Sequence, residues 1–190
     1  MNTAISIIEE MPLMIGDRVR ILLTYRNVKP ASFVDLFDPN RDTNKPDSYD
    51  LPKQVEVELE HNLARVGLQY LKRDRAIVVG EDEIFMQRSL YFGRDKESLT
   101  RLLTAHSPSE FGIAFGFPQS AIEAYIGKRK RFHGQFPEDI SNDTLRFSEF
   151  VKSADNWREE LKTPQQWADV TRSSSLYLYQ TYMQESLVTQ

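Results

Sequence analysis

The chain has 190 residues, which is long enough for one well-buried domain. Its 40% hydrophobic and 27% charged residues exclude the compositions of disordered and fibrous proteins. The 24 basic and 28 acidic side chains give a net charge of -4, so any basic patch must be local. We expect a single domain over residues 1–190, with an α+β part at 1–105 and a helical part at 106–190.

The sequence has no cysteine, which removes disulfides, thiolate nucleophiles and sulfur-ligated metal sites. The first ten residues include two acidic side chains and lack a basic leader, and no stretch approaches the roughly 20 apolar residues of a membrane span. We therefore expect a cytoplasmic protein with no membrane partner. We also expect neither a metal nor another cofactor.

The first third of the chain contains signals for a helix, a strand and a loop. Residues 4–13 suit a short helix, whereas residues 18–25 alternate at first and then become wholly apolar, which favours a strand. The stretch 38–53 holds three prolines among several aspartates and is predicted to form a long exposed loop. Loops of this length are often functional, but the sequence does not indicate the purpose of this one.

A helix and a hairpin are predicted next. Apolar residues recur at spacings of four and three from Val55 to Tyr70, which predicts a helix of about 18 residues ending near Lys72. The apolar runs 76–79 and 84–92 flank Gly80-Glu81-Asp82-Glu83 and are typical of a hairpin.

Helical signals dominate from Asp95 onward. Asp95 is positioned to cap a helix that carries three leucines on one face, at 99, 102 and 103. Thr163-Pro164-Gln165-Gln166 predicts another helix start, with Thr163 as the cap and the helix running into the region of Tyr182. The fold class is therefore α+β, with a small antiparallel sheet from the N-terminal half and a mainly helical C-terminal half.

Residues 107–127 predict two short helices joined by a tight turn. Ser107 stands three residues before Glu110, with Pro108 between them, which is the pattern of a capping box. Gly116 can take the positive φ that closes the first helix, and Pro118 can open the second.

This spacing resembles the helix-turn-helix family of DNA-binding segments over residues 108–127. The resemblance implies that Gly112 lets the helices approach, that Gly116 makes the turn, and that Ile122 with Tyr125 or Ile126 seals the pair. It also implies which residues of the second helix face the groove of DNA: Gln119, Ser120, Glu123 and Ala124. Gln119 could then read adenine, whereas Glu123 would need to accept from a cytosine amino group.

The densest basic run of the chain follows directly, at Lys128, Arg129, Lys130 and Arg131. Residues 106–136 carry four basic and two acidic side chains, whereas residues 137–190 carry five and nine. Clustered cations beside a helix suit phosphate contacts. The alternative is a packed helical hairpin whose end is solvated by these side chains, since Pro118 is a poor cap and cannot donate to a phosphate.

A second resemblance involves residues 90–95, the leucine-rich helix and Phe115-Gly116-Phe117-Pro118. It is to a poorly characterised group of archaeal and bacterial proteins in which a similar strand and helix precede a Gly-Tyr-Pro segment ending in paired cysteines. Gln119 and Ser120 stand where those cysteines would fall, so any sulfur chemistry of the pair is excluded here.

Other side-chain groupings favour structural roles over chemical ones. Glu58 and His61 share a helical face, but a di-metal site needs two such pairs. His106 adjoins Ser107, yet sequence neighbours rarely face each other and capping already explains the serine. The acidic residues 81–83 lack further oxygen ligands at fixed spacing and are typical of a solvated turn.

Three function classes remain open. The leading one is a non-enzymatic binding protein that contacts duplex DNA through the seven residues predicted as its nucleic-acid site: Gln119, Ser120, Glu123, Lys128, Arg129, Lys130 and Arg131. The second is a protein-interaction or structural subunit, binding itself or another protein through the aromatic-rich C-terminal third and the loop 38–53. The third is an enzyme whose active site leaves no linear motif, since we identify no catalytic residue.

Overall fold

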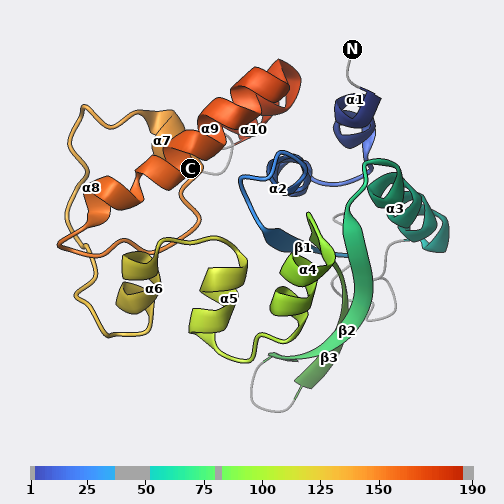
Figure 1. Cartoon of the computed structure of the whole chain (residues 1–190), viewed down its shortest axis with the longest axis horizontal. Helices are drawn as coiled ribbons and strands as arrows, with labels where there is room; N and C mark the ends of the chain where they lie inside the picture. The colour runs from blue at the N-terminus through green and yellow to red at the C-terminus, as the bar shows by residue number, and fades with distance from the viewer. Residues whose placement is uncertain (1–2, 37–51, 80–82, 186–190) are drawn as a thin grey trace.

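The computed structural model describes residues 3–36, 52–79 and 83–185, and its architecture is α+β (Figure 1). A three-stranded antiparallel sheet has the order β1-β3-β2. Its strands are β1 (Ala31–Asp35), β2 (Gln69–Val79) and β3 (Glu83–Gly93). Three helices of the N-terminal half accompany them: α1 (Thr3–Glu10), α2 (Ile15–Tyr25) and α3 (Lys53–Arg65).

The second half of the chain is mainly helical, so the predicted fold class is confirmed. Figure 1 shows α4, α5 and α6 following one another along one side of the molecule. The helices of this half are α4 (Lys96–Leu103), α5 (Pro108–Ala114), α6 (Gln119–Tyr125), α7 (Asn142–Arg146), α8 (Trp157–Glu160), α9 (Lys162–Ser174) and α10 (Leu176–Glu185). No helix among the described residues has both the length and the apolar character needed to cross a membrane.

The predicted hairpin is confirmed as β2 and β3, which pair over their full length from Gln69 opposite Gly93 to Val79 opposite Glu83. β1 pairs only with the C-terminal half of β3, from Ala31 opposite Gly93 to Asp35 opposite Ser89. Residues 80–82 and most of the predicted loop 38–53 lie outside the described residues.

The strand predicted for residues 18–25 is wrong, because these residues belong to helix α2. Arg18 and Arg20 alternate with apolar residues over a few positions and so imitate a strand. Over its whole length, however, α2 buries apolar side chains on more than one side of the helix. It does so because it packs against α1, α9, α10 and β1. The buried apolar residues of α2 are Ile15, Val19, Ile21, Leu22 and Leu23.

The helix predicted to end near Lys72 ends instead at Arg65, and Tyr70 and Lys72 belong to β2. Gly67 stops the helix with a φ of 81°. Its N–H donates to the carbonyl of Ala64, and the N–H of Leu68 donates to the carbonyl of Leu63 at 3.1 Å. This pair of bonds is a Schellman motif. Tyr70 stands four residues after Val66, so the apolar spacing of the helix continues past the turn at Gly67 although Tyr70 belongs to β2.

The long C-terminal helix is divided into α9 and α10 at Ser175. α9 begins at Lys162 directly after α8, so Thr163 lies within its first turn, and the predicted capping role of Thr163 is wrong. Ser175 has extended backbone, and its hydroxyl accepts from the N–H of Leu178 at 3.0 Å, which starts α10.

Two hydrophobic clusters lie on opposite faces of the sheet. The larger cluster contains Leu90 and Phe92 of β3 together with Trp167 of α9 and Leu178 of α10, so it combines side chains from both halves. The smaller one contains Tyr91, whose side chain points to the opposite face, with residues of α4 and α5. Asp95 caps α4 as predicted, accepting from the N–H of Ser98 at 2.7 Å.

Candidate functional site

The helix pair α5–α6 begins at the predicted capping box. The hydroxyl of Ser107 accepts from the N–H of Glu110, and the Glu110 carboxylate accepts from the N–H of Ser107 at 3.0 Å. The same carboxylate accepts from the N–H of His106 at 2.7 Å. These backbone donors hold the pKa of Glu110 below its ordinary value. The first helix therefore starts where its sequence indicates.

Two glycines set the geometry of the pair. A Cβ added to Gly112 would lie 2.7 Å from Cγ1 of Ile122, so the helices approach closely at this point. Gly116 has a φ of 76°, and a Cβ there would lie 2.7 Å from Cδ of Pro30. The turn is thus fixed against the segment that joins α2 to β1. Both glycine roles agree with the spacing of the sequence.

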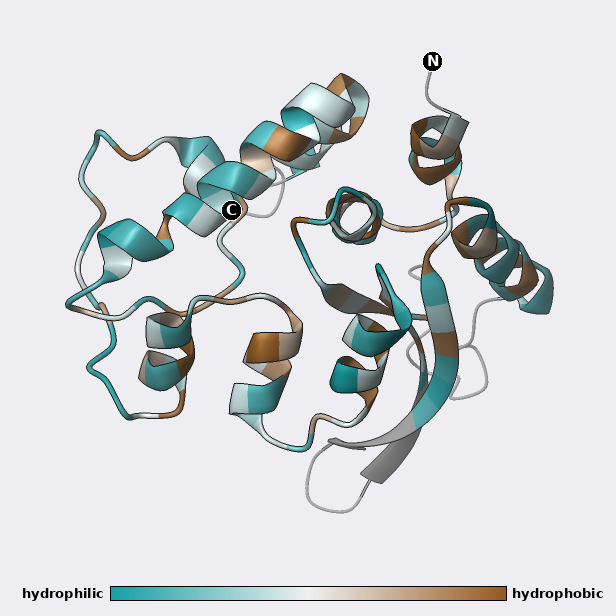
Figure 2. Cartoon of the chain, viewed as in Figure 1, coloured by the Kyte–Doolittle hydropathy of each residue, from teal (hydrophilic) through white to brown (hydrophobic). Residues whose placement is uncertain are grey.

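An apolar groove of about 390 Å³ lies between the two helices and the segment 149–151. Figure 2 shows the apolar colouring on both helices. The lining is mostly aromatic and aliphatic: Pro108, Phe111, Gly112, Phe115, Phe117, Ala121, Ile122, Tyr125, Glu149, Phe150 and Val151. Glu149 is the one titratable acid or base in this lining besides the Tyr125 phenol. Clefts of this size with a few polar groups are typical of binding sites.

Behind the groove, Glu149 forms ion pairs with two cations from the first half of the chain. Its Oε2 accepts from Lys29 Nζ, and its Oε1 accepts from Arg20 Nε at 3.2 Å. Arg20 also contacts Asp17 at 3.0 Å, so two cations and two carboxylates form one cluster. The charge of Glu149 is therefore balanced within the protein.

Three aromatic rings also lie close to the Lys29 ammonium. Nζ lies 4.5 Å from the ring centre of Trp167, 5.6 Å from that of Phe117 and 6.0 Å from that of Phe115. Two of these rings also line the groove. Lys29 is only 1% exposed, and the rings and Glu149 together stabilise its charge.

Burial and charge act in opposite directions on this cluster. Burial lowers the pKa of Lys29, and the nearby Glu149 only partly offsets that effect. Burial alone would raise the pKa of Glu149, but the charges of Lys29 and Arg20 hold it below its ordinary value. Glu149 therefore stays ionised, with both oxygens bound, and is poorly suited to transferring protons.

The predicted base-contacting residues lie at α6, in different environments. Gln119 is exposed, and its Nε2 donates to Glu123 Oε1 at 3.0 Å. Ser120 accepts from Asn156 Nδ2 at 3.0 Å, because α6 packs against α8 at this point. Ala124 is completely buried. Gln119 is thus the most exposed of the four residues that the helix-turn-helix resemblance directs toward DNA.

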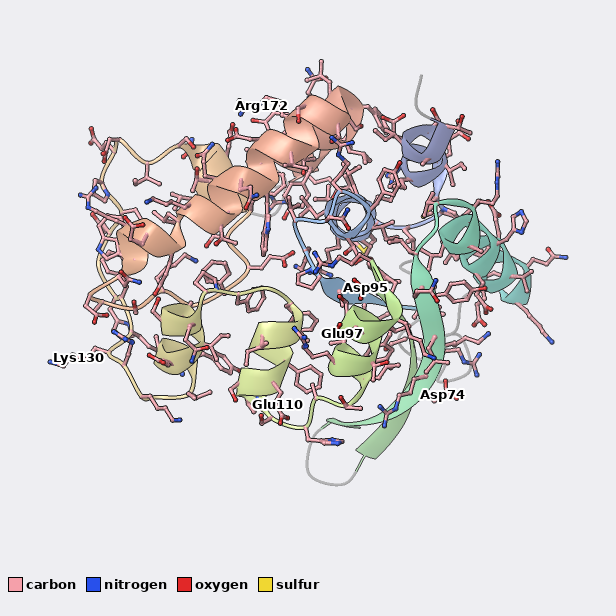
Figure 3. The ribbon with its side chains drawn as sticks, viewed as in Figure 1. Asp74, Asp95, Glu97, Glu110, Lys130 and Arg172 are labelled. Carbon is pink, nitrogen blue, oxygen red and sulfur yellow. The ribbon has the colours of Figure 1, made fainter. Side chains whose placement is uncertain are left out.

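The four predicted phosphate-binding cations are all exposed but differ in their partners. Arg129 is paired with Glu123 and, at 2.8 Å, with Asp155. Arg131 donates to the carbonyls of Ala124 and Tyr125 and so caps the C-terminal end of α6. The other two, Lys128 and Lys130, have no ion-pair partner in the part of the chain that the structure describes, and Lys130 projects from the edge of the molecule (Figure 3).

The remaining sequence candidates are dispersed. Glu58 and His61 are both exposed on α3. Within residues 3–36, 52–79 and 83–185, no group of three or more acidic or histidine side chains is gathered closely enough to hold a metal. In the C-terminal third, Tyr177 is half exposed at 52%, whereas the hydroxyl of Tyr179 is bonded to Asp143.

Lys29, Glu149 and Phe150 have no sequence pattern that predicts them as members of a site. Lys29 stands next to a turn and a proline, a context typical of a solvated surface lysine. Glu149 and Phe150 lie 24 or more residues beyond α6, and no local pattern connects them to it. The sequence signal for this site is the run of phenylalanines at 111, 115 and 117, of which Phe117 contacts Phe150 and the other two pack toward the sheet and α4.

No family model matches the chain, and no curated protein or solved structure matches it. Its function is therefore inferred from the groove, the ion-pair cluster and the basic segment beside them.

Proposed function

We propose that this chain is a non-enzymatic binding protein that recognises another polypeptide, and that the groove between α5 and α6 receives an aromatic side chain of the partner. The observation that carries the proposal is the aromatic lining around a space of about 390 Å³. Apolar pockets that accept an aromatic anchor are the usual centres of protein interfaces.

The groove is held rigid by its surroundings. Phe117 packs against Phe150 with ring centres 5.0 Å apart, and both lie near the buried Trp167. The contact of Gly112 with Ile122 fixes the two helices relative to each other. A preformed pocket loses little conformational entropy when it binds, which favours affinity.

Glu149 gives the groove a polar contact for the anchor. Each carboxylate oxygen already accepts one bond, from Lys29 or Arg20, and each can accept another. A neutral donor suits this position better than a cation, because the two existing cations repel a third. A tryptophan N–H or a tyrosine O–H meets both the apolar and the polar requirement.

The experiment uses N-acetyl-tryptophanamide as a probe, observed by two-dimensional NMR of the labelled protein. Tyr125 is 53% exposed and lines the groove, whereas Ile113 is 45% exposed and lies outside it. We expect shifts confined to the groove, and affinity about fivefold weaker in Tyr125→Ala, about 1 kcal/mol. Ile113→Ala is the matched control and should bind like the parent. Shifts scattered over the surface, or equal losses in both variants, would contradict the proposal.

A second candidate function is binding of duplex DNA through residues 108–131. It is favoured by the exposure of Gln119, Lys128 and Lys130, and opposed by the burial of Ala124. If phosphates bind here, Lys128→Ala/Lys130→Ala should weaken DNA binding and lower the dependence of affinity on salt by about two ions. Lys96→Ala on α4 is the control. Unchanged affinity in the double variant would remove this candidate.

A further inference from the structure

We infer that the partner segment carries carboxylates next to its aromatic anchor, so that the ligand of the groove is an acidic peptide. This inference rests on the proposed function and adds the charge of the ligand to it. It is carried by the basic residues at the end of α6, which adjoin the groove through Tyr125.

Arg131 connects the basic segment directly to the groove. Its Nη2 donates to the carbonyl of Tyr125 at 2.7 Å, and its Nε donates to the carbonyl of Ala124 at 3.2 Å. Its guanidinium carbon lies 5.7 Å from the centre of the Tyr125 ring. One face of a groove-lining ring is therefore next to a fixed positive charge.

The same segment is also attached to the other wall of the groove. The N–H of Ala154 donates to the carbonyl of Lys130 at 2.8 Å, and the N–H of Phe132 donates to the carbonyl of Lys152 at 2.8 Å. These bonds surround an isolated antiparallel bridge between Arg131 and Ser153, and residues 152–154 follow immediately after Phe150 and Val151, which line the groove. The basic residues are thus held at a defined position relative to the cavity.

Not every cation of the segment is available to a ligand. Arg129 is neutralised by Glu123 and Asp155. Lys128 and Lys130 are exposed, and neither forms a close ion pair among the residues described, although the charge of Lys128 acts on Glu123 from a distance. With Arg131 they leave a local excess of positive charge on a chain whose net charge is -4. Charge complementarity of this kind steers binding and selects partners.

An acidic peptide fits both features, whereas a duplex nucleic acid fits only one. Phosphates would meet the lysines, but a paired duplex keeps its bases stacked and offers no side chain that could fill an aromatic groove. A basic or neutral peptide could fill the groove but would gain nothing from Lys128 and Lys130. The combination therefore favours an aromatic anchor with neighbouring aspartate or glutamate.

The test compares three blocked hexapeptides that share one central tryptophan and differ in the flanking residues, which are glutamate, glutamine or lysine. Affinities are measured by calorimetry at low and at moderate salt. We expect the glutamate peptide to bind about tenfold more tightly than the glutamine peptide at low salt, and the ratio to fall as salt is raised. The lysine peptide should bind most weakly.

Two variants separate the charge from the groove. Lys128→Ala/Lys130→Ala should reduce the preference for glutamate to about that due to Arg131 alone, while the glutamine peptide binds as before. Tyr125→Ala should weaken all three peptides, and Lys96→Ala should change none. Equal affinity for the glutamate and glutamine peptides would overturn this inference and leave the proposed function standing. No binding of any peptide would overturn both, and tighter binding of a DNA duplex through the same two lysines would replace the acidic peptide with a nucleic acid.

Discussion

Lys29 and Glu149 are 120 residues apart in sequence and form an ion pair between the two halves of the chain. The lysine side chain is 2% exposed and the glutamate side chain is 23% exposed. Lys29 follows α2, and Glu149 belongs to the segment that lines the groove, so the pair connects the core of the first half to the candidate site.

Because the two partners are buried to different extents, their removal should have unequal costs. Glu149→Gln leaves a fully buried ammonium without its counter-charge and should lower the free energy of unfolding by about 3 kcal/mol. Lys29→Met leaves a carboxylate that is partly hydrated and still paired with Arg20, so it should cost less. Urea unfolding at pH 7 measures both.

The double variant Lys29→Met/Glu149→Gln completes this comparison. It removes both charges, so it should be more stable than Glu149→Gln alone. Equal costs for the two single variants, or strictly additive costs in the double variant, would contradict the assignment of this ion pair as a coupled buried unit.

The close approach of α5 and α6 makes a second prediction. In Gly112→Ala the new Cβ would lie 2.7 Å from Cγ1 of Ile122, so the variant should lose about 1–3 kcal/mol of stability. Adding Ile122→Ala removes the clashing atoms. The double variant should therefore lose less than the sum of the single variants, as measured by thermal or urea unfolding. Additive losses would show that the cost of Gly112→Ala does not arise from its contact with Ile122.

The capping box makes a third prediction, specific to the start of α5. Ser107→Ala removes the hydroxyl that accepts from the N–H of Glu110 and should cost about 1 kcal/mol. Ser107→Thr keeps an acceptor at the same position and serves as the control, with a loss of only a few tenths of a kcal/mol. Equal losses in both variants would mean that the side chain acts through packing and not as a cap.

These local features explain which parts of the fold the sequence predicts well. The capping roles of Asp95 and Ser107 and the turn at Gly116 depend on bonds within a few residues, so the local pattern contains the information. The hairpin is similar, since its strands pair with each other. The strand predicted at 18–25 was wrong because α2 is buried on several sides, which removes the clear polar face that identifies a helix.

The candidate site depends on contacts that no short pattern records. The spacing of Gly112, Gly116 and Ile122 predicts the helix pair, and the structure has it. The space between the helices becomes a groove only because Glu149 and Phe150 come to line it from a distant segment. The burial of Lys29 likewise follows from three aromatic rings that lie far from it in sequence.

Lys152 makes the last prediction, which concerns pH. It is 5% exposed, its Nζ donates to the carbonyl of Phe150 at 2.6 Å, and it lies 3.7 Å from the centre of the Phe150 ring. Burial lowers the pKa of Lys152 from 10.5 to about 8, and the nearby Glu160 only partly offsets this. Between these pH values the unfolded chain binds more protons than the folded one, so the contribution of Lys152 to stability rises with pH.

Lys152→Met cannot titrate. Its stability relative to the parent should therefore fall by up to about 3 kcal/mol as the pH is raised from 7 to 10.5, measured by urea unfolding at each pH. A constant difference between the two proteins over this range would show that the pKa of Lys152 is the same in the folded and unfolded states.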